Sequence, residues 1–191
     1  DGASLVDYNR AGVPLMEIVS DSSLRSAEEA YDYLVRIRQI VRYVGASTGD
    51  MEKGAMRCEA NISVRPEGSS EYGTKVEVKN LNSFRSVRNA ITYEVERQVR
   101  VLEGGGKVTQ ITAGWDESAG VTREQRSKET SEDYRYFPEP DLLRVELESA
   151  WVERLRGQMP ELPNVKAERF AAQYGLGAQE IEVLVDDQGV A

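Results

Sequence analysis

Two segments of the chain, residues 56–64 and 73–79, alternate apolar and polar residues at the period of a β-strand. Successive side chains of a strand point to opposite faces, so each segment is predicted to bury one apolar face. The opposite face then carries only polar groups, and it is either exposed to solvent or the floor of a site. The polar side chains are Arg57, Glu59, Asn61 and Ser63 in the first segment and Lys75, Glu77 and Lys79 in the second.

A third, mainly apolar segment, residues 15–20, contains the carboxylate of Glu17. A carboxylate among apolar neighbours is costly unless a cation or a hydrogen-bond network meets it. The structural interpretation pairs Glu17 with an arginine such as Arg10, and the functional one gives it a metal ion or a phosphate group. If the three segments are strands of one sheet, Glu17, Glu59 and Glu77 would face one cation. Oxygen ligands of this kind suit Mg²⁺.

Two longer segments repeat their apolar residues at the period of an α-helix. The first is predicted to begin at Ser26, which forms a capping box with Glu29, and to end at Gly45. The second is predicted to begin after Ser83 and to end at the glycines that start with Gly104. Its predicted buried stripe is Val87, Ile91, Val95, Gln98 or Val99, and Leu102.

The N-terminus of this second helix is a predicted anion site, because it offers free backbone N–H groups next to the cation of Lys79. The glycine run 104–106 is not a phosphate loop, because such loops precede a helix and this run follows one. The residues predicted to bind a nucleotide are Lys79, Asn80, Asn82 and Ser83.

The remaining segments complete an α+β fold with a mostly antiparallel sheet and packed helices. Residues 1–147 are predicted to form this domain, and residues 148–191 the start of a helical domain. The further predicted strands are 4–9, 15–20, 107–115, 121–126 and 134–137, and the further predicted helices are 150–156, 165–174 and 179–185.

The composition excludes several kinds of chemistry. The 191 residues include no His and one Cys, which removes Ser-His and Cys-His catalytic groups, disulfides and Cys-cluster metal sites. Cys58 falls on the apolar side of its strand and is predicted to be a packed small hydrophobe. No apolar run approaches the roughly 18 residues of a membrane span, and the lone cysteine without a secretory segment predicts a cytoplasmic protein. The first residue is Asp, so the chain is interpreted as an internal fragment.

The net charge of −9 argues against a general binder of nucleic-acid backbones. A local basic group in the middle of the chain is either an RNA-facing patch or a solvated face of mixed charge. Its members are Lys75, Lys79, Arg85, Arg88 and Arg97.

Four motifs, in this order, resemble the B subunit of the aspartyl/glutamyl-tRNA amidotransferase. The resemblance covers essentially the whole chain. It departs at Asp21-Ser22, where the family usually has Glu-Pro, and at Glu59, where Asp is usual; the longer Glu59 side chain changes the metal distance. The motifs are residues 5–20 (LVDYNRAGVPLMEIVS), 51–61 (MEKGAMRCEAN), 78–84 (VKNLNSF) and 133–142 (DYRYFPEPDL).

The resemblance implies the second half of the family's cradle domain and an ATP-dependent amide synthesis. The family phosphorylates the side-chain carboxylate of misacylated Glu-tRNA(Gln) or Asp-tRNA(Asn), and ammonia then displaces the phosphate. The amidase, or A subunit, supplies the ammonia, and a small C subunit holds the two larger subunits together. ATP and Mg²⁺ are the implied cofactors. The implied roles are catalysis for Arg57 and Lys79, nucleotide binding for Lys79, Asn80, Asn82 and Ser83, and metal binding for Glu17, Glu59 and Glu77.

Three alternatives stay open at this point. The archaeal glutamate-specific paralogue resembles the B subunit but carries an inserted domain. This chain has no such insertion between Asp141 and Pro160, which favours the B subunit. A non-catalytic tRNA-binding or assembly module would use the carboxylates structurally. Asp133 and Arg135 belong either to a structural aromatic corner or to the surroundings of the site.

Overall fold

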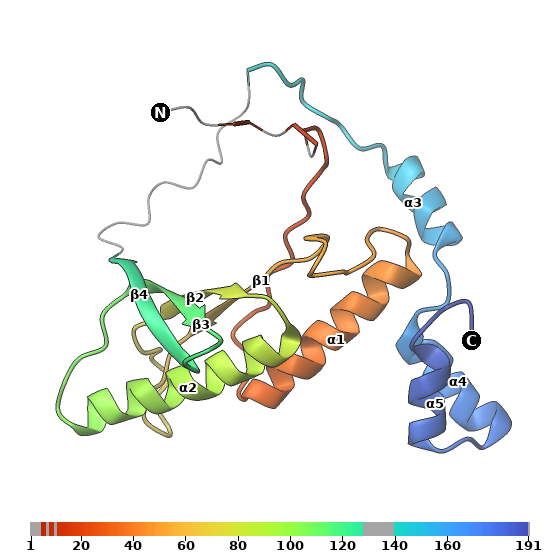
Figure 1. The fold of residues 1–191 in the computed structure, drawn as a ribbon. Helices are drawn as coiled ribbons and strands as arrows, with labels where there is room; N and C mark the ends of the chain where they lie inside the picture. The colour runs from red at the N-terminus through yellow and green to blue at the C-terminus, as the bar shows by residue number, and fades with distance from the viewer. Residues whose placement is uncertain (1–4, 7, 10, 128–139, 191) are drawn as a thin grey trace.

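The computed structural model describes residues 5–6, 8–9, 11–127 and 140–190, which form an α+β fold with a mostly antiparallel sheet, as predicted (Figure 1). The strands are β1 (Cys58–Ile62), β2 (Val76–Leu81), β3 (Ile111–Asp116) and β4 (Val121–Ser127), and the helices are α1 (Ala27–Tyr43), α2 (Phe84–Glu103), α3 (Ser149–Gln158), α4 (Pro163–Tyr174) and α5 (Ala178–Val185).

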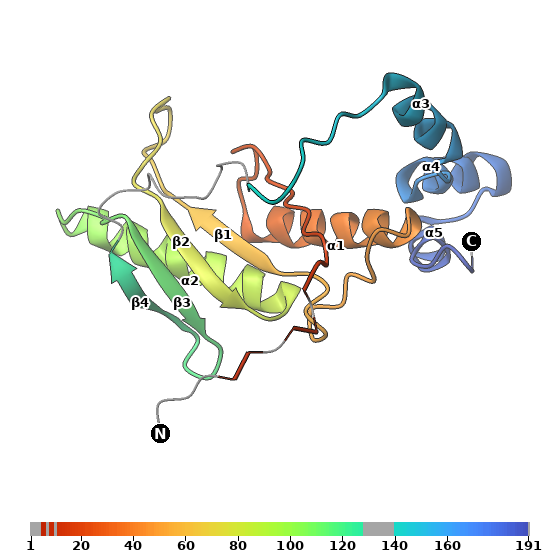
Figure 2. The same cartoon turned by 90° about the horizontal axis from the view of Figure 1, so that it is seen from above.

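The strands form one four-stranded sheet in the order β1-β2-β3-β4, which is also their order in the chain. β1 pairs with β2 and β3 pairs with β4 in antiparallel fashion, which confirms the predicted strands 56–64, 73–79, 107–115 and 121–126 as neighbours in one sheet. β2 and β3 are parallel, and α2 makes the connection between them. Figure 2 shows α2 running back behind the strands, and no helix among the described residues covers the other face of the sheet.

The apolar face of the sheet packs on α2, and α1 extends this core. Ser26 and Ser83 cap the two helices as predicted, because each side-chain oxygen accepts a hydrogen bond from the backbone N–H three residues later. The reciprocal bond of the predicted capping box is not formed, because the Glu29 carboxylate accepts from the backbone N–H of Arg25 rather than of Ser26. The ring of Tyr31 meets the ring of Phe84 edge-on at 6.3 Å and joins the two helices. The buried core comprises Cys58, Ala60, Ile62, Val76, Val78, Leu81, Phe84, Val87, Ala90, Ala113 and Trp115.

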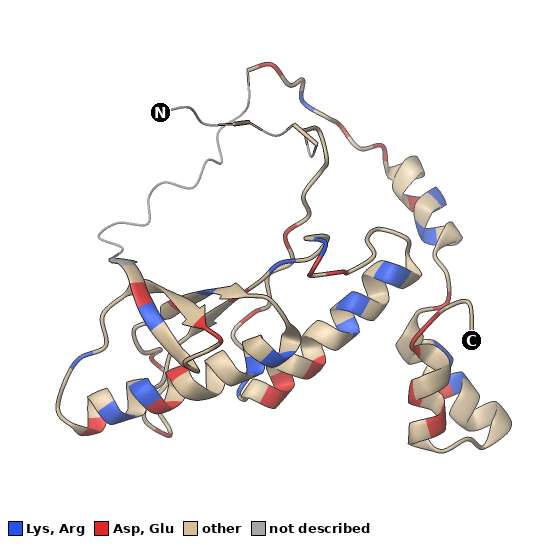
Figure 3. Ribbon diagram, in the orientation of Figure 1, with Lys and Arg blue, Asp and Glu red and all other residues tan. Residues whose placement is uncertain are grey.

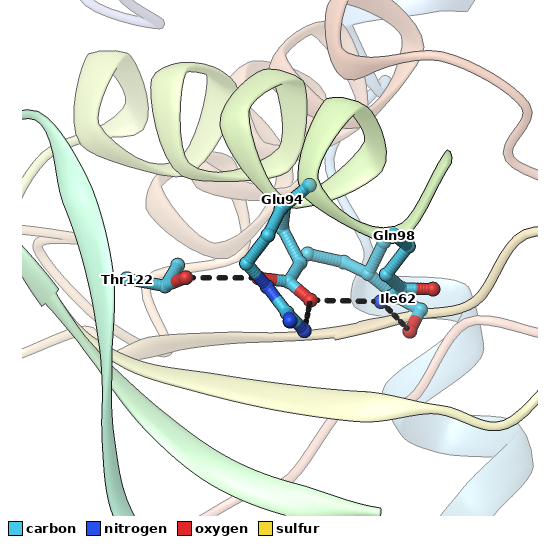
Figure 4. A network of polar contacts seen from close by, with 5 residues as sticks. Ile62, Glu94, Gln98 and Thr122 are labelled. Carbon is cyan, nitrogen blue, oxygen red and sulfur yellow. Dashed lines mark hydrogen bonds and ion pairs between the residues drawn. The ribbon is translucent and has the colours of Figure 1, made fainter. Parts of the chain in front are cut away.

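The stripe that α2 buries differs from the prediction in the second half of the helix. Of the alternatives Gln98 and Val99, Gln98 is the buried one, with no exposed surface, whereas Val99 and Leu102 are exposed; Glu94, which was not predicted, is also fully buried. Hydrogen bonds compensate for most of this burial of polar groups, although Gln98 Oε1 has no partner among the described residues (Figure 4). The carboxylate of Glu94 accepts from Thr122 Oγ1 at 2.9 Å and from Gln98 Nε2 at 2.9 Å, and Gln98 Nε2 also donates to a backbone carbonyl of β1. Apolar periodicity alone cannot locate a stripe that is satisfied in this way.

The predicted strands 4–9 and 15–20 are wrong within the residues that the structure describes, because these have no strand pairing. The segment contains a turn in which Ala11 N–H donates to the carbonyl of Tyr8, and Leu15 is 92% exposed. A strand needs a partner for its backbone groups, and no strand of the described sheet pairs with this segment. The predicted strand 134–137 lies outside the described residues.

The three predicted C-terminal helices are confirmed as α3, α4 and α5. α4 and α5 share a small core of Phe170, Ile181 and Val185, and they lie at the end of α1 (Figure 1). Tyr43 Oη on α1 donates to the carbonyl of Val185 at 2.8 Å, and Lys166 Nζ lies 5.3 Å from the centre of the Tyr43 ring. The domain boundary at residue 147 stays a prediction. No helix among the described residues is long and apolar enough to span a membrane.

Candidate functional site

The candidate site is the face of the sheet that points away from α2. β1 and β2 present buried residues to the helix and polar residues to the opposite side, as the alternation predicted. Glu59, Glu77 and Lys79 lie on this polar face, and the structure brings their charged groups together. Lys79 Nζ is 3.1 Å from Glu59 Oε1 and 3.3 Å from Glu77 Oε1. We call these three residues the Lys79 cluster.

The two carboxylates of the Lys79 cluster differ in exposure. The side chain of Glu59 is 50% exposed and that of Glu77 is 12% exposed. Glu77 Oε2 also accepts a hydrogen bond from Thr112 Oγ1 at 3.0 Å, so both oxygens of Glu77 have partners. Glu77 therefore belongs to the floor of the site, whereas Glu59 lies at its surface.

The surroundings of Lys79 keep its amine protonated. Burial lowers the pKa of this amine, but hydrogen bonds and charges from Glu59 and Glu77 outweigh the burial and raise the pKa above its ordinary value. The ammonium is thus a permanent positive charge at neutral pH. It is held by two anions and is still about one third exposed, so it can reach a ligand above the sheet.

The sequence reasoning missed three residues of this face, on β3 and β4. Thr112 is buried against Glu77, and Gly114 is paired with Lys79 across the parallel strands. A Cβ atom at Gly114 would lie 2.4 Å from Gln125 Nε2, so the glycine makes room for the Gln125 side chain. The alternation of β1 and β2 could not reveal these residues, because they depend on which strand lies next to β2.

At the predicted anion site, two of the proposed ligands already have internal partners. Ser83 Oγ accepts from the backbone N–H of Ser86 at 3.0 Å, which is its capping bond. Asn80 Nδ2 donates to the carbonyl of Trp115 at 2.8 Å. Asn82 is exposed, and its Nδ2 lies 3.5 Å from Asn80 Oδ1. Asn80, Asn82 and Ser83 are exposed, whereas Lys79 is half-buried between its two carboxylate partners.

The structure records no contact between the Lys79 cluster and two other predicted site residues, Arg57 and Glu17. Arg57 is exposed and directly precedes β1, and Glu17 is exposed in the unpaired N-terminal segment. Within the described residues, no three His, Cys, Asp or Glu side chains form a group that could hold a metal ion. The metal role of Glu17, Glu59 and Glu77 stays a prediction. Asp133, Arg135 and Arg10 lie outside the described residues.

The predicted basic group is partly neutralised by its surroundings. Arg97 pairs with the buried Glu94 at 2.6 Å, and Arg88 lies 3.6 Å from Glu28. Figure 3 shows acidic and basic residues interspersed along α2. These contacts favour a solvated face of mixed charge over a continuous RNA-facing patch. Burial raises the pKa of the Cys58 thiol to about 11, in keeping with the predicted packing role.

Comparisons with known proteins identify the family. The family model described as GatB/GatE catalytic domain matches residues 1–153. The B subunit of the aspartyl/glutamyl-tRNA(Asn/Gln) amidotransferase of Roseiflexus sp. (strain RS-1) is 54% identical over 191 residues, which are 100% of this chain and 39% of that protein. The proteins of the same name from Moorella thermoacetica and Synechococcus elongatus are 53% and 52% identical, over 100% and 98% of this chain and 40% and 38% of their own lengths. The chain thus spans about two fifths of these curated relatives, and it belongs to the GatB/GatE catalytic-domain family.

Proposed function

We propose that this chain is part of the B subunit of a tRNA-dependent amidotransferase. The proposed reaction converts misacylated Glu-tRNA(Gln) or Asp-tRNA(Asn) into Gln-tRNA(Gln) or Asn-tRNA(Asn). Its support is the family membership, the names of the relatives and the four motifs of the sequence. The relatives carry the name of the B subunit, which favours this assignment over the glutamate-specific paralogue.

The chemistry has two steps. An oxygen of the aminoacyl side-chain carboxylate first bonds to the γ-phosphorus of ATP, and ADP leaves. The nitrogen of ammonia then attacks the acyl carbon, the bond from that carbon to the phosphate oxygen breaks, and phosphate leaves as the nitrogen loses a proton. Phosphoryl transfer depends on positioning and charge stabilisation rather than on a protein nucleophile. A chain without His and with a buried Cys58 suits such a reaction.

The observation that carries this proposal is the position of Lys79. Its ammonium lies between Glu59 and Glu77, on the face of the sheet that α2 does not cover, and in the chain Lys79 precedes Ser83, the cap of α2, by four residues. The N-terminal end of a helix attracts anions, and a fixed cation beside it adds to this attraction. We propose that Lys79 contacts the phosphoryl group in transfer, with Arg57 as a second cation and Asn82 as a nucleotide contact.

ATP and Mg²⁺ are the cofactors that we propose for the whole protein. Mg²⁺ bound with ATP would neutralise charge on the phosphates. The carboxylates proposed for it in this chain are Glu17, Glu59 and Glu77. Glu77 fits this role least, because Lys79 and Thr112 already engage both of its oxygens. We therefore assign no step of the reaction to a metal held by this chain alone.

The proposed partners are the misacylated tRNA, the amidase or A subunit, which releases ammonia from glutamine, and the small C subunit. The proposed location is the cytoplasm. In this scheme the chain described here would supply part of the phosphorylation site.

The proposal can be tested with Lys79→Gln in the full-length protein assembled with its partner subunits. Glutamine removes the charge but keeps a similar length. We expect ATP-dependent formation of amidated tRNA to fall by roughly 10²-fold or more, because an interaction specific to the transition state is lost. Glutaminase activity should survive. Lys107→Gln is the matched control, because it makes the same substitution at an exposed lysine in the loop between α2 and β3.

A non-catalytic assembly role predicts a different outcome. In that case Lys79→Gln would change assembly or tRNA affinity and leave the rate of each assembled complex unaltered. An active Lys79→Gln complex with normal acyl-phosphate formation would refute the proposed role of Lys79. A wild-type complex that forms no amidated tRNA would refute the proposed function itself.

A further inference from the structure

The end of β2 contains an extra residue relative to β1. Cys58 pairs with Leu81, and Ala60 pairs with Val78. One residue on β1 therefore lies opposite two residues on β2, Lys79 and Asn80. This arrangement is a β-bulge, which bends a strand and changes the direction of the side chains that follow.

The backbone of Asn80 explains why the bulge lies at this residue. Its φ is +61°, in the left-handed region that disfavours most residues other than Gly, Asn and Asp. It is the one non-glycine residue with a positive φ among the described residues. Its side chain donates to the carbonyl of Trp115, one position beyond Gly114, the last residue of β3 that pairs with β2. The amide of Asn80 thus extends the contact between β2 and β3 after the ladder has ended.

The bulge decides which face each neighbouring side chain occupies. Val78 and Leu81 are three residues apart, and a regular strand would place them on opposite faces. Both are nevertheless buried in the core, at 0% and 4% exposure. The extra residue therefore lets Leu81 enter the core while Lys79 stays on the opposite face. It also brings the chain directly to Ser83, the cap of α2.

We infer that Asn80 is a positioning residue: its left-handed bulge and its bond to Trp115 hold the Lys79 ammonium between Glu59 and Glu77. This role replaces the direct nucleotide contact that the sequence suggested for Asn80. The catalytic consequence of the inference rests on the proposed function, but the placement of Lys79 can be measured without it.

The first experiment measures that placement. Amine acylation followed by mass spectrometry gives the labelling rate of Lys79 in the full-length protein, with Lys107 as the internal reference. We expect Lys79 to react more slowly than Lys107, because its ammonium is paired twice and only partly exposed. Asn80→Ala should raise the labelling of Lys79 several-fold, because alanine disfavours the left-handed backbone and makes no bond to Trp115. Asn80→Gly accepts this backbone and should change the labelling less.

The second experiment asks whether Asn80 acts through Lys79. Rates of amidated tRNA formation are measured for each assembled complex, in a double-mutant cycle with Lys79→Gln. We expect the rate to fall tenfold or more in Asn80→Ala and about threefold in Asn80→Gly. When Lys79→Gln is already present, adding either Asn80 substitution should lower the rate less than twofold further. If Asn80→Ala does not assemble, Asn80→Gly alone completes the cycle.

Three outcomes would overturn the inference. If Asn80→Gly and Asn80→Ala lower the rate equally, and do so in the Lys79→Gln background as well, Asn80 would be a direct nucleotide ligand. Lower thermal stability with unchanged labelling and unchanged rate per complex would make it purely structural. If the Asn80 variants leave both the labelling of Lys79 and the rate of amidated tRNA formation unchanged, Asn80 would have no role in placing Lys79. If the wild-type complex is inactive, the proposed function fails, and the labelling result still decides whether Asn80 positions Lys79.

Discussion

Replacing Glu94 with glutamine should destabilise the fold strongly, although the two side chains have almost the same shape. Glu94 is fully buried, and its two oxygens accept hydrogen bonds from Arg97, Gln98 and Thr122. Glutamine keeps one of these acceptor oxygens and turns the other into a donor. Whichever oxygen becomes the NH₂ group faces an N–H of Arg97, which can only donate, so at least this hydrogen bond is lost and buried polar atoms stay unpaired.

The magnitude follows from these contacts. Each buried polar group left without a partner costs about 1–3 kcal/mol. Breaking a fully buried ion pair costs about 3–5 kcal/mol, but the Arg97 side chain is 29% exposed and water can solvate it in the variant. We therefore expect Glu94→Gln to lower the free energy of unfolding by about 2–4 kcal/mol. Glu96→Gln is the control: Glu96 lies on the exposed side of α2 and pairs with Arg100 at 3.7 Å, so its loss should cost less than about 0.5 kcal/mol.

Urea denaturation of the full-length protein measures both values, with the fluorescence of the buried Trp115 as the probe of this domain and every other tryptophan, including Trp151, replaced by phenylalanine. The pH dependence is a second check. Burial raises the pKa of Glu94, but the bonds from Arg97, Gln98 and Thr122 lower it further, so the net pKa is below its ordinary value.

A depressed carboxylate pKa contributes stability above the pKa of the unfolded state, which is about 4.3 for glutamate, and loses it as the pH falls through the lower folded value. The difference between wild type and Glu94→Gln should therefore be constant near neutral pH and shrink below about pH 4. Equal stabilities for Glu94→Gln and Glu96→Gln at pH 7 would refute the reasoning.

Two further predictions concern other buried groups. Cys58 should resist alkylation by iodoacetamide at pH 8 in the folded protein and react once urea unfolds it, because burial raises its pKa to about 11; fast labelling of the native state would contradict its packing role. Tyr43→Phe should remove the bond to Val185 and lower stability by about 1 kcal/mol, with faster hydrogen exchange in α4 and α5 as the specific readout. Unchanged exchange in these helices would show that the bond does not hold them to α1.

The sequence was sufficient where a pattern is local. The caps Ser26 and Ser83 mark the starts of α1 and α2, and strand alternation placed Glu59, Glu77 and Lys79 on one face. Each of these features depends on residues a few positions apart, so the chain itself records them.

The sequence was insufficient where the outcome depends on a distant partner. Residues 15–20 have the composition of a strand but pair with no described strand. Glu94 is polar in the sequence, yet donors from β4 and its own helix permit its burial. Asn80 carried a signal in its type, since asparagine tolerates a positive φ, but the bulge is defined only by the register of β1 against β2.

The order of the sheet bears on how the domain folds during synthesis. Because the strands lie side by side in the order in which they are made, each new strand can add to one that is already available. α2 must form before β3 can take its parallel place beside β2. Gln98 then contacts β1 through Ile62, and Glu94 contacts β4 through Thr122, so their network is complete only when β4 arrives. The helix thereby ties together the two outer strands of the described sheet, and this buried network forms only when all four of these strands are in place.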